Sequence, residues 1–140
     1  MRILIVDDEA LGLSRLKRML GTLGFDDITE AADADEARDA VIHSHIDLAL
    51  LDINMPGLTG LEVLPKIIEV DPDAVVIMLT GHATVESAIE GMKLGAFDYL
   101  LKPCDMDHLI SKVNEAASKK RQHEEKIINA RIKEITARRA

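Results

Sequence analysis

The sequence contains very few aromatic residues and almost no cysteine. Phe, Tyr and Trp together make up 2% of the 140 residues, and Trp is absent. The 47% hydrophobic fraction therefore predicts a core built from Leu, Ile, Val, Ala and Met. The single cysteine, Cys104, excludes an internal disulfide, and no neighbouring His or Cys suggests that it binds a metal.

Long apolar runs are absent as well. No run approaches the roughly 18 residues that a membrane-spanning helix needs. Met1 leads straight into a predicted strand, with no targeting signal. We therefore expect a cytoplasmic protein without a membrane span, and the length predicts one domain with a core of ordinary size.

Short apolar runs alternate along the chain with segments that have the apolar period of a helix. The strands are predicted at 2–6, 28–31, 48–52, 74–79 and 96–101. The helices are predicted at 10–23, 33–43, 60–70 and 83–94, with a last helix that begins near Asp105. Five such repeats with right-handed crossovers predict an α/β fold, a doubly wound five-stranded parallel sheet with helices on both faces.

Polar side chains follow four of the predicted strands. The first strand ends in Asp7 and Asp8, the third in Asp52, the fourth in Thr80 and the fifth in Lys102. In open α/β sheets, ligands bind at the carboxyl ends of the strands. Crowded carboxylates need a cation to stay ionised at neutral pH, and oxygen ligands without Cys or His favour Mg²⁺. The sequence therefore predicts a small hard-metal site.

Each of these features has a simpler interpretation when taken alone. Asp52 could cap the next helix or begin a turn, and Asp7-Asp8-Glu9 could form a solvated turn. Thr80-Gly81 and Lys102-Pro103 carry little information by themselves. Their occurrence together at four strand ends favours one shared site.

The order of these motifs resembles a two-component response regulator receiver domain. The resemblance rests on Asp-Asp after the first strand, Leu-Asp-Ile-Asn-Met-Pro-Gly at 51–57, Thr-Gly at 80–81 and Lys-Pro at 102–103. It covers residues 2 to 103. The resemblance implies a flavodoxin-like sheet with strand order 2-1-3-4-5. A receiver needs no extended C-terminal helix, which is predicted here because helix-forming residues without Gly or Pro run on to Ala140.

The resemblance also implies the roles of the acidic residues. Asp52 is then the phosphoacceptor and belongs to the metal site. Asp8 is a direct Mg²⁺ ligand, Asp7 a ligand through water, and Asn54 a ligand through its backbone carbonyl. The phosphoryl donor implied is a phosphohistidine of a sensor histidine kinase.

Three further residues take the places that receivers use for switching. Thr80 and Lys102 are the groups that sense the phosphoryl group, and Thr80 with Tyr99 forms the implied switch. Phosphorylation is then expected to change the surface formed by the fourth helix, the fifth strand and the fifth helix. The resemblance describes a signalling switch, not an enzyme that turns over external substrates.

The C-terminal segment differs from the rest in charge. From Ser118 onward there are eight basic and three acidic residues, which leaves nine basic and 22 acidic residues before it. We therefore predict a receiver domain at 1–117 and a helical extension or linker at 118–140. The acidic domain suits a cation site and disfavours direct binding of nucleic acid.

The extension carries an apolar stripe without Gly or Pro, formed by Ile127, Ile128, Ile132 and Ile135. It covers one or two heptads, too few to establish a coiled coil. A solvated helix face, dimerisation and coupling to an output domain stay open. A homodimer could form through this helix or through the fourth helix, fifth strand and fifth helix.

The output of such a receiver is open as well. The stretches at 81–88 and 95–103 resemble receivers attached to transcriptional activators with ATPase domains, which predicts transcription regulation if the chain is part of a longer protein. Two other functions compete with the receiver. A Mg²⁺-dependent phosphatase with an aspartyl nucleophile would need a second acid where Asn54 stands, and a flavodoxin-like electron carrier would need a phosphate-binding loop where Asp7-Asp8-Glu9 stands.

Overall fold

The computed structural model describes residues 1–53, 60–81, 85–102 and 105–139. Its strands are β1 (Ile3–Val6), β2 (Ile28–Ala31), β3 (Leu48–Asp52), β4 (Val75–Thr80) and β5 (Asp98–Leu101). Its helices are α1 (Ala10–Thr22), α2 (Ala34–His43), α3 (Gly60–Val70), α4 (Val85–Lys93) and α5 (Met106–Arg139). The predicted alternation of strand and helix is confirmed.

The strands form one parallel sheet in the order β2-β1-β3-β4-β5, as predicted. The register places Val6 of β1 beside Leu51 of β3, and Asp52 beside Leu79 of β4. The carboxyl ends of the three central strands therefore lie next to one another. This edge of the sheet is called the carboxyl edge below, and the opposite edge the amino edge.

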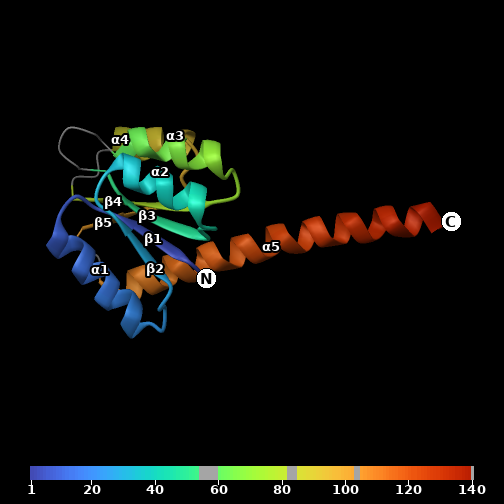
Figure 1. Cartoon of the computed structure of the whole chain (residues 1–140), viewed down its shortest axis with the longest axis horizontal. Helices are drawn as coiled ribbons and strands as arrows, with labels where there is room; N and C mark the ends of the chain where they lie inside the picture. Colours follow the sequence, from blue (N-terminus) through green and yellow to red (C-terminus); the bar gives the residue numbers. More distant parts are fainter. Residues whose placement is uncertain (54–59, 82–84, 103–104, 140) are drawn as a thin grey trace.

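Helices cover both faces of the sheet. Figure 1 shows α2, α3 and α4 on one face and α1 and α5 on the other. Side chains alternate along each strand, so Leu4 and Val6 belong to the core under α2 and α3, while Ile3 and Ile5 belong to the core under α1 and α5. A fully buried Leu or Ile contributes about 1.5–3 kcal/mol, so aliphatic residues supply most of the stabilisation of both cores, and Phe25 and Phe97 pack, partly buried, against the core under α1 and α5.

Local hydrogen bonds fix the ends of several helices. The Asp33 carboxylate accepts the Glu36 N–H at 2.8 Å and begins α2. The Asp105 carboxylate accepts the His108 N–H at 2.8 Å, which agrees with the expected start of the last helix. The chain leaves α4 through Gly95, whose φ of 110° suits glycine, and β5 consequently begins at Asp98 and not at residue 96.

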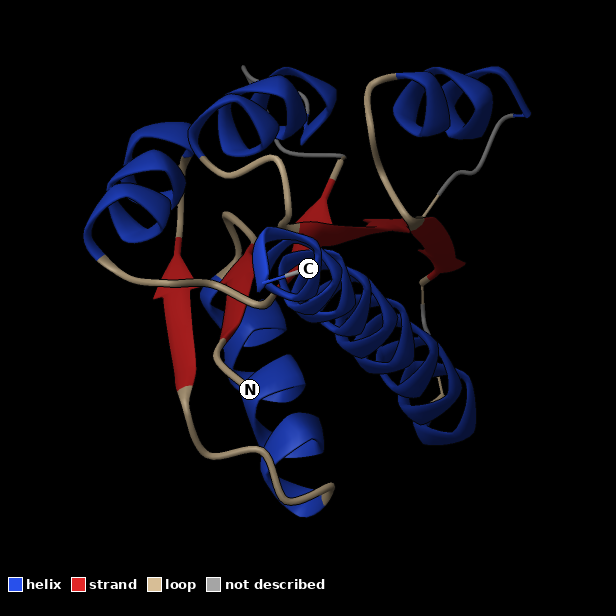
Figure 2. Cartoon of the chain, turned by 90° about the vertical axis from the view of Figure 1, so that its right-hand side faces the viewer, coloured by secondary structure: helices blue, strands red, loops and turns tan. Residues whose placement is uncertain are grey.

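The last helix, α5, is much longer than the others, with 34 residues. Its first turns bury Leu109, Val113 and Ala116 against the sheet, and Lys120 is still buried. From residue 121 to 138 every residue is exposed, and Figure 1 shows this part of α5 extending away from the domain. Figure 2 shows the same helix nearly end-on, with its C-terminal end toward the viewer. In the part of the chain that the structure describes, no helix has the length and apolar character needed to span a membrane.

Candidate functional site

The functional side chains are positioned by backbone pairing that continues past the strand ends. The Asp7 N–H donates to the Ala31 carbonyl at 3.1 Å, and the Ile53 N–H donates to the Leu79 carbonyl at 3.0 Å. The Lys102 N–H donates to the Thr80 carbonyl at 2.7 Å. The backbone at the carboxyl edge is therefore held in place where the predicted site residues occur.

Three carboxylates lie together at this edge. Asp7 and Asp52 are almost fully buried, at 1% and 4% exposure, and Asp8 is exposed. One oxygen from each of the three lies within 4.8 Å of the others. These are hard oxygen donors, one of them open to solvent, so the arrangement fits Mg²⁺, which keeps part of its water shell when bound to carboxylates.

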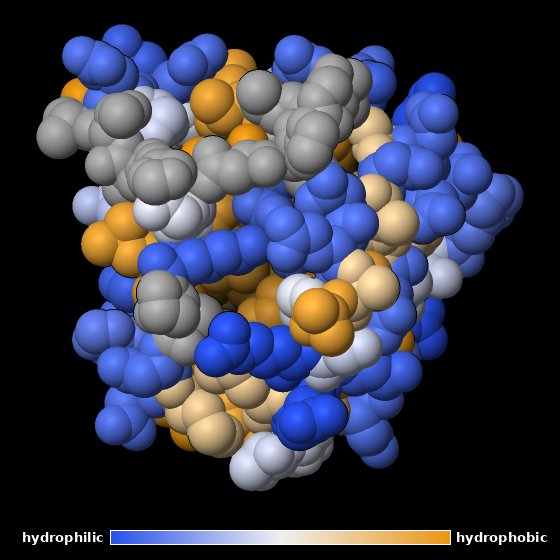
Figure 3. Space-filling view, turned by 90° about the vertical axis from the view of Figure 1, so that its left-hand side faces the viewer, coloured by the Kyte–Doolittle hydropathy of each residue, from blue (hydrophilic) through white to orange (hydrophobic). Residues whose placement is uncertain are grey.

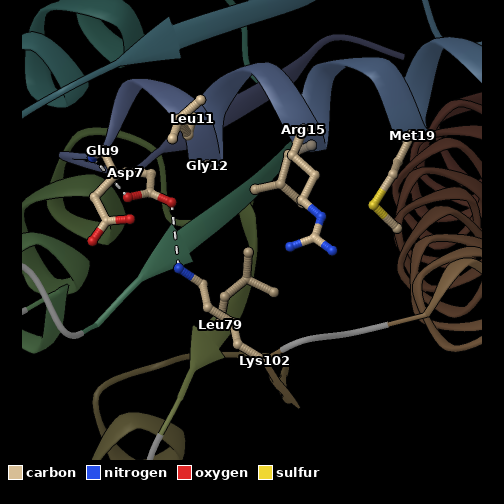
Figure 4. A pocket seen from close by; sticks show the side chains of 9 residues that line it. Asp7, Glu9, Leu11, Gly12, Arg15, Met19, Leu79 and Lys102 are labelled. Atoms are coloured by element: carbon tan, nitrogen blue, oxygen red, sulfur yellow. Dashed lines mark hydrogen bonds and ion pairs between the residues drawn. The ribbon is translucent and has the colours of Figure 1, made fainter.

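Lys102 extends between two of these carboxylates. Its Nζ lies 3.1 Å from Asp52 Oδ2 and 3.3 Å from Asp7 Oδ2, and Figure 4 shows the contact with Asp7. Burial lowers the pKa of Lys102, but the hydrogen bond and charge of Asp52, followed by those of Asp7, outweigh it and raise the pKa above 10.5. Lys102 is therefore a cation at neutral pH. One lysine among three carboxylates leaves an excess of negative charge that a divalent cation can balance.

The Asp7 carboxylate has a second contact that the sequence did not reveal. Its Oδ1 accepts the Glu9 N–H at 3.0 Å, while Oδ2 faces Lys102. The contact is local, two residues apart, and an aspartate before a helix often forms such a turn. The contacts of both oxygens therefore fix the orientation of the Asp7 carboxylate.

The two switch candidates occupy different environments. Thr80, the last residue of β4, is buried at 2% exposure. Tyr99 is 40% exposed and borders a shallow hollow with Ile89 and Met92 of α4. The remaining predicted ligand, Asn54, lies outside the described residues.

A pocket of about 320 Å³ adjoins the carboxylate cluster. Figure 3 shows this face of the molecule, where hydrophilic residues surround a hollow with a hydrophobic floor. In Figure 4, Arg15 and Met19 extend from α1 toward the pocket, which Asp7 and Lys102 also line. Solvent or a partner can therefore approach the site beside α1.

Comparison with known proteins agrees with this geometry. Residues 3–114 match the model of the response regulator receiver domain. A solved receiver domain shares the fold of this sheet and its helices, and the chain belongs to the response regulator receiver domain family.

Individual relatives show how widely the domain is used. The chain is 36% identical over 135 residues to YesN of Bacillus subtilis, an uncharacterised transcriptional regulatory protein, covering 94% of this chain and 37% of that protein. A receiver domain protein (CheY-like) from Methanospirillum hungatei superimposes with a TM-score of 0.82 at 33% identity, covering 87% of this chain and 97% of that one. NtrX from Brucella abortus, crystallised with ATP, gives a TM-score of 0.82 at 32% identity, covering 89% of this chain and 28% of that one.

The chain spans only part of the curated proteins that it matches. It aligns with 37% of YesN and with 25% of the regulatory protein LuxO of Vibrio vulnificus.

Proposed function

We propose that the chain is a phosphoacceptor switch in which Asp52 receives a phosphoryl group from the phosphohistidine of a sensor kinase. An Asp52 carboxylate oxygen attacks phosphorus, a P–O bond forms, and the P–N bond breaks with its electron pair leaving on the imidazole of the kinase. A carboxylate acting as the nucleophile needs no general base. The observation that supports this most directly is that Lys102 Nζ lies 3.1 Å from the buried Asp52 carboxylate, beside Asp7 and Asp8.

Two positive charges are proposed to act on the phosphoryl group at Asp52, one from a bound Mg²⁺ ion and one from Lys102. Asp8 and Asp7, with Asp52 and the Asn54 carbonyl, would hold Mg²⁺, with Asp7 acting through water. When bound, the ion supplies positive charge to the phosphoryl oxygens. Lys102, which lies between Asp7 and Asp52, supplies a second positive charge, so charge that develops during transfer meets a group that is already oriented.

The output of the switch is proposed to pass through Thr80 and Tyr99. A phosphoryl group adds about 1.5–2 negative charges and strong acceptors next to β4. The Thr80 hydroxyl can then turn toward it, and Tyr99 can turn from its exposed position into the space that is vacated. The equilibrium between the two arrangements shifts by their difference in contacts with the phosphoryl group.

The surface that would respond is partly apolar. Six exposed hydrophobic residues lie on α4, β5 and the start of α5, namely Ile89, Met92, Tyr99, Leu101, Met106 and Ile110. We propose this surface, or the Ile stripe of residues 127–135, as the contact for a second copy or for an output domain. The relatives that are transcriptional regulators support control of transcription as the output, with 118–140 as the linker after a receiver at 1–117.

The decisive experiment is phosphorylation by a small acyl phosphate or phosphoramidate in Mg²⁺, followed by intact-protein mass spectrometry. We expect one phosphoryl group on the wild-type chain and none on Asp52→Asn. Asp47→Asn, which changes an aspartate at the amino edge, is the matched control and should be labelled like the wild type. Undiminished labelling of Asp52→Asn would refute the assignment of the nucleophile.

A further inference from the structure

Helix α1 comes unusually close to Asp7 at Gly12. A Cβ atom placed on Gly12 would lie 2.2 Å from Asp7 Oδ2 and 3.0 Å from Asp7 Cγ. The first distance is far inside van der Waals contact. Figure 4 shows Gly12 on the turn of α1 that lies over the Asp7 carboxylate. Any other residue at position 12 would therefore displace this carboxylate or move the helix.

Asp7 has little freedom to make room. Its side chain is buried, Oδ1 accepts the Glu9 N–H at 3.0 Å, and Oδ2 lies 3.3 Å from Lys102 Nζ. A rotation that moved Oδ2 away from α1 would break one of these contacts. It would also shift the carboxylate relative to Asp8 and Asp52.

The same helix contains a second glycine for comparison. Gly21 has no atom within 4 Å of an added Cβ. Glycine is less favourable than alanine inside a helix. At position 21 an added Cβ would meet no atom, so the available space does not explain the glycine. At position 12 the Asp7 carboxylate, part of the proposed metal site, occupies the volume that a Cβ would need.

We propose that Gly12 is a positioning residue for the metal site. Without a side chain it leaves the volume in which Asp7 Oδ2 contacts Lys102 while Asp7 stays within the cluster of Asp8 and Asp52. Mg²⁺ requires near-ideal octahedral geometry, so a shift of about an ångström in one carboxylate weakens its binding. The proposal rests on the Mg²⁺ site of the proposed function.

The first test compares Gly12→Ala with Gly21→Ala by titrating each protein with Mg²⁺ in a calorimeter. We expect Gly12→Ala to bind Mg²⁺ roughly tenfold more weakly than the wild type, in the range seen when groups that orient metal ligands are changed. Gly21→Ala should bind like the wild type. Binding by Gly12→Ala that is as tight as that of the wild type, or tighter, overturns the proposal.

The second test asks whether Gly12 acts through Asp7. In an Asp7→Ala background no carboxylate remains to clash, so adding Gly12→Ala should leave the Mg²⁺ affinity and the thermal midpoint unchanged or raise the midpoint. A further loss of affinity overturns the proposal. Should Gly12→Ala fail to fold, a folded double variant supports the clash and an unfolded one refutes it.

Failure of the function and failure of this inference are distinguishable. If wild-type protein binds Mg²⁺ but Asp52 is never labelled, the phosphoacceptor function fails while the Gly12 comparison is still valid. If Asp52 is labelled normally and Gly12→Ala binds Mg²⁺ like the wild type, only the inference fails.

Discussion

Both edges of the sheet hold a lysine against aspartate, and the surroundings of the two lysines differ. At the carboxyl edge, Lys102 contacts Asp7 and Asp52 at 3.3 and 3.1 Å. At the amino edge, Lys120 Nζ lies 3.2 Å from Asp47 Oδ1 and is even more deeply buried. A buried lysine–aspartate pair is therefore not by itself the mark of a functional site.

The two edges of the sheet differ in their balance of positive and negative charge. At the amino edge, Asp47 also accepts the Arg2 N–H at 2.8 Å, and the Arg2 side chain pairs with Asp27 at 3.1 Å. Burial raises the pKa of Asp47, but the Arg2 N–H and then Lys120 outweigh it and hold the pKa below 3.8. Asp47 and Asp27 at the amino edge thus each contact a cation, whereas at the carboxyl edge three carboxylates share Lys102.

The largest expected effect concerns Lys102. Lys102→Ala should slow phosphorylation of Asp52 by small phosphodonors roughly 100-fold, about 2.7 kcal/mol, because a preorganised cation no longer faces the developing charge. The rate is measured by quenched mass spectrometry in Mg²⁺. Lys120→Ala should be labelled at the wild-type rate. An equal loss of rate in both variants would show that the lysine at the carboxyl edge has no special role in phosphorylation.

The next effect concerns Lys120. Lys120→Met should lower the free energy of unfolding by about 2 kcal/mol, because Asp47 then loses its cation. This is less than the cost of breaking a fully buried pair, since the Asp47 side chain is 22% exposed. Urea unfolding followed by circular dichroism measures it. The same change at the exposed Lys133 is the control, and equal stability of both variants would show that the pair contributes nothing.

A smaller effect is expected in the pH dependence of stability. Because the folded-state pKa of Asp47 is depressed, its contribution is present above pH 3.8 and lost as the pH falls through the folded-state value. The stability difference between wild type and Asp47→Asn should thus be full at neutral pH and shrink below pH 3.8. Unfolding curves at several pH values test this, and a difference that grows on acidification would contradict it.

The smallest effect is expected in the projecting part of α5. Ile132 is 54% exposed, so Ile132→Ser should change the free energy of unfolding by no more than about 0.5 kcal/mol in dilute protein. Unfolding at low and high protein concentration checks this. A loss that appears only at high concentration would indicate that two copies associate through the stripe, and a large loss in dilute protein would place the stripe against its own domain.

The sequence predicted the sheet and the gathering of Asp7, Asp52 and Lys102, because apolar runs and turn residues mark strands and parallel strands share their carboxyl edge. It did not predict the Lys120–Asp47 pair. That contact joins residues far apart in sequence and depends on how α5 rotates as it crosses the sheet. The close approach of α1 at Gly12 was missed for the same reason, although a glycine inside a helix was a signal of it.

Contacts between α5 and β5 have a mechanical consequence. Lys112 Nζ lies 2.6 Å from Asp98, and Lys119 Nζ lies 4.8 Å from the centre of the Phe97 ring, so the helix is joined to the strand that leads to Lys102. Beyond Lys120 the helix continues to Arg139, for about 28 Å at 1.5 Å per residue, and a tilt of about 10° at its base would move the far tip by about 5 Å. The length of the helix therefore means that a small change of angle at its base would become a larger displacement at its far end.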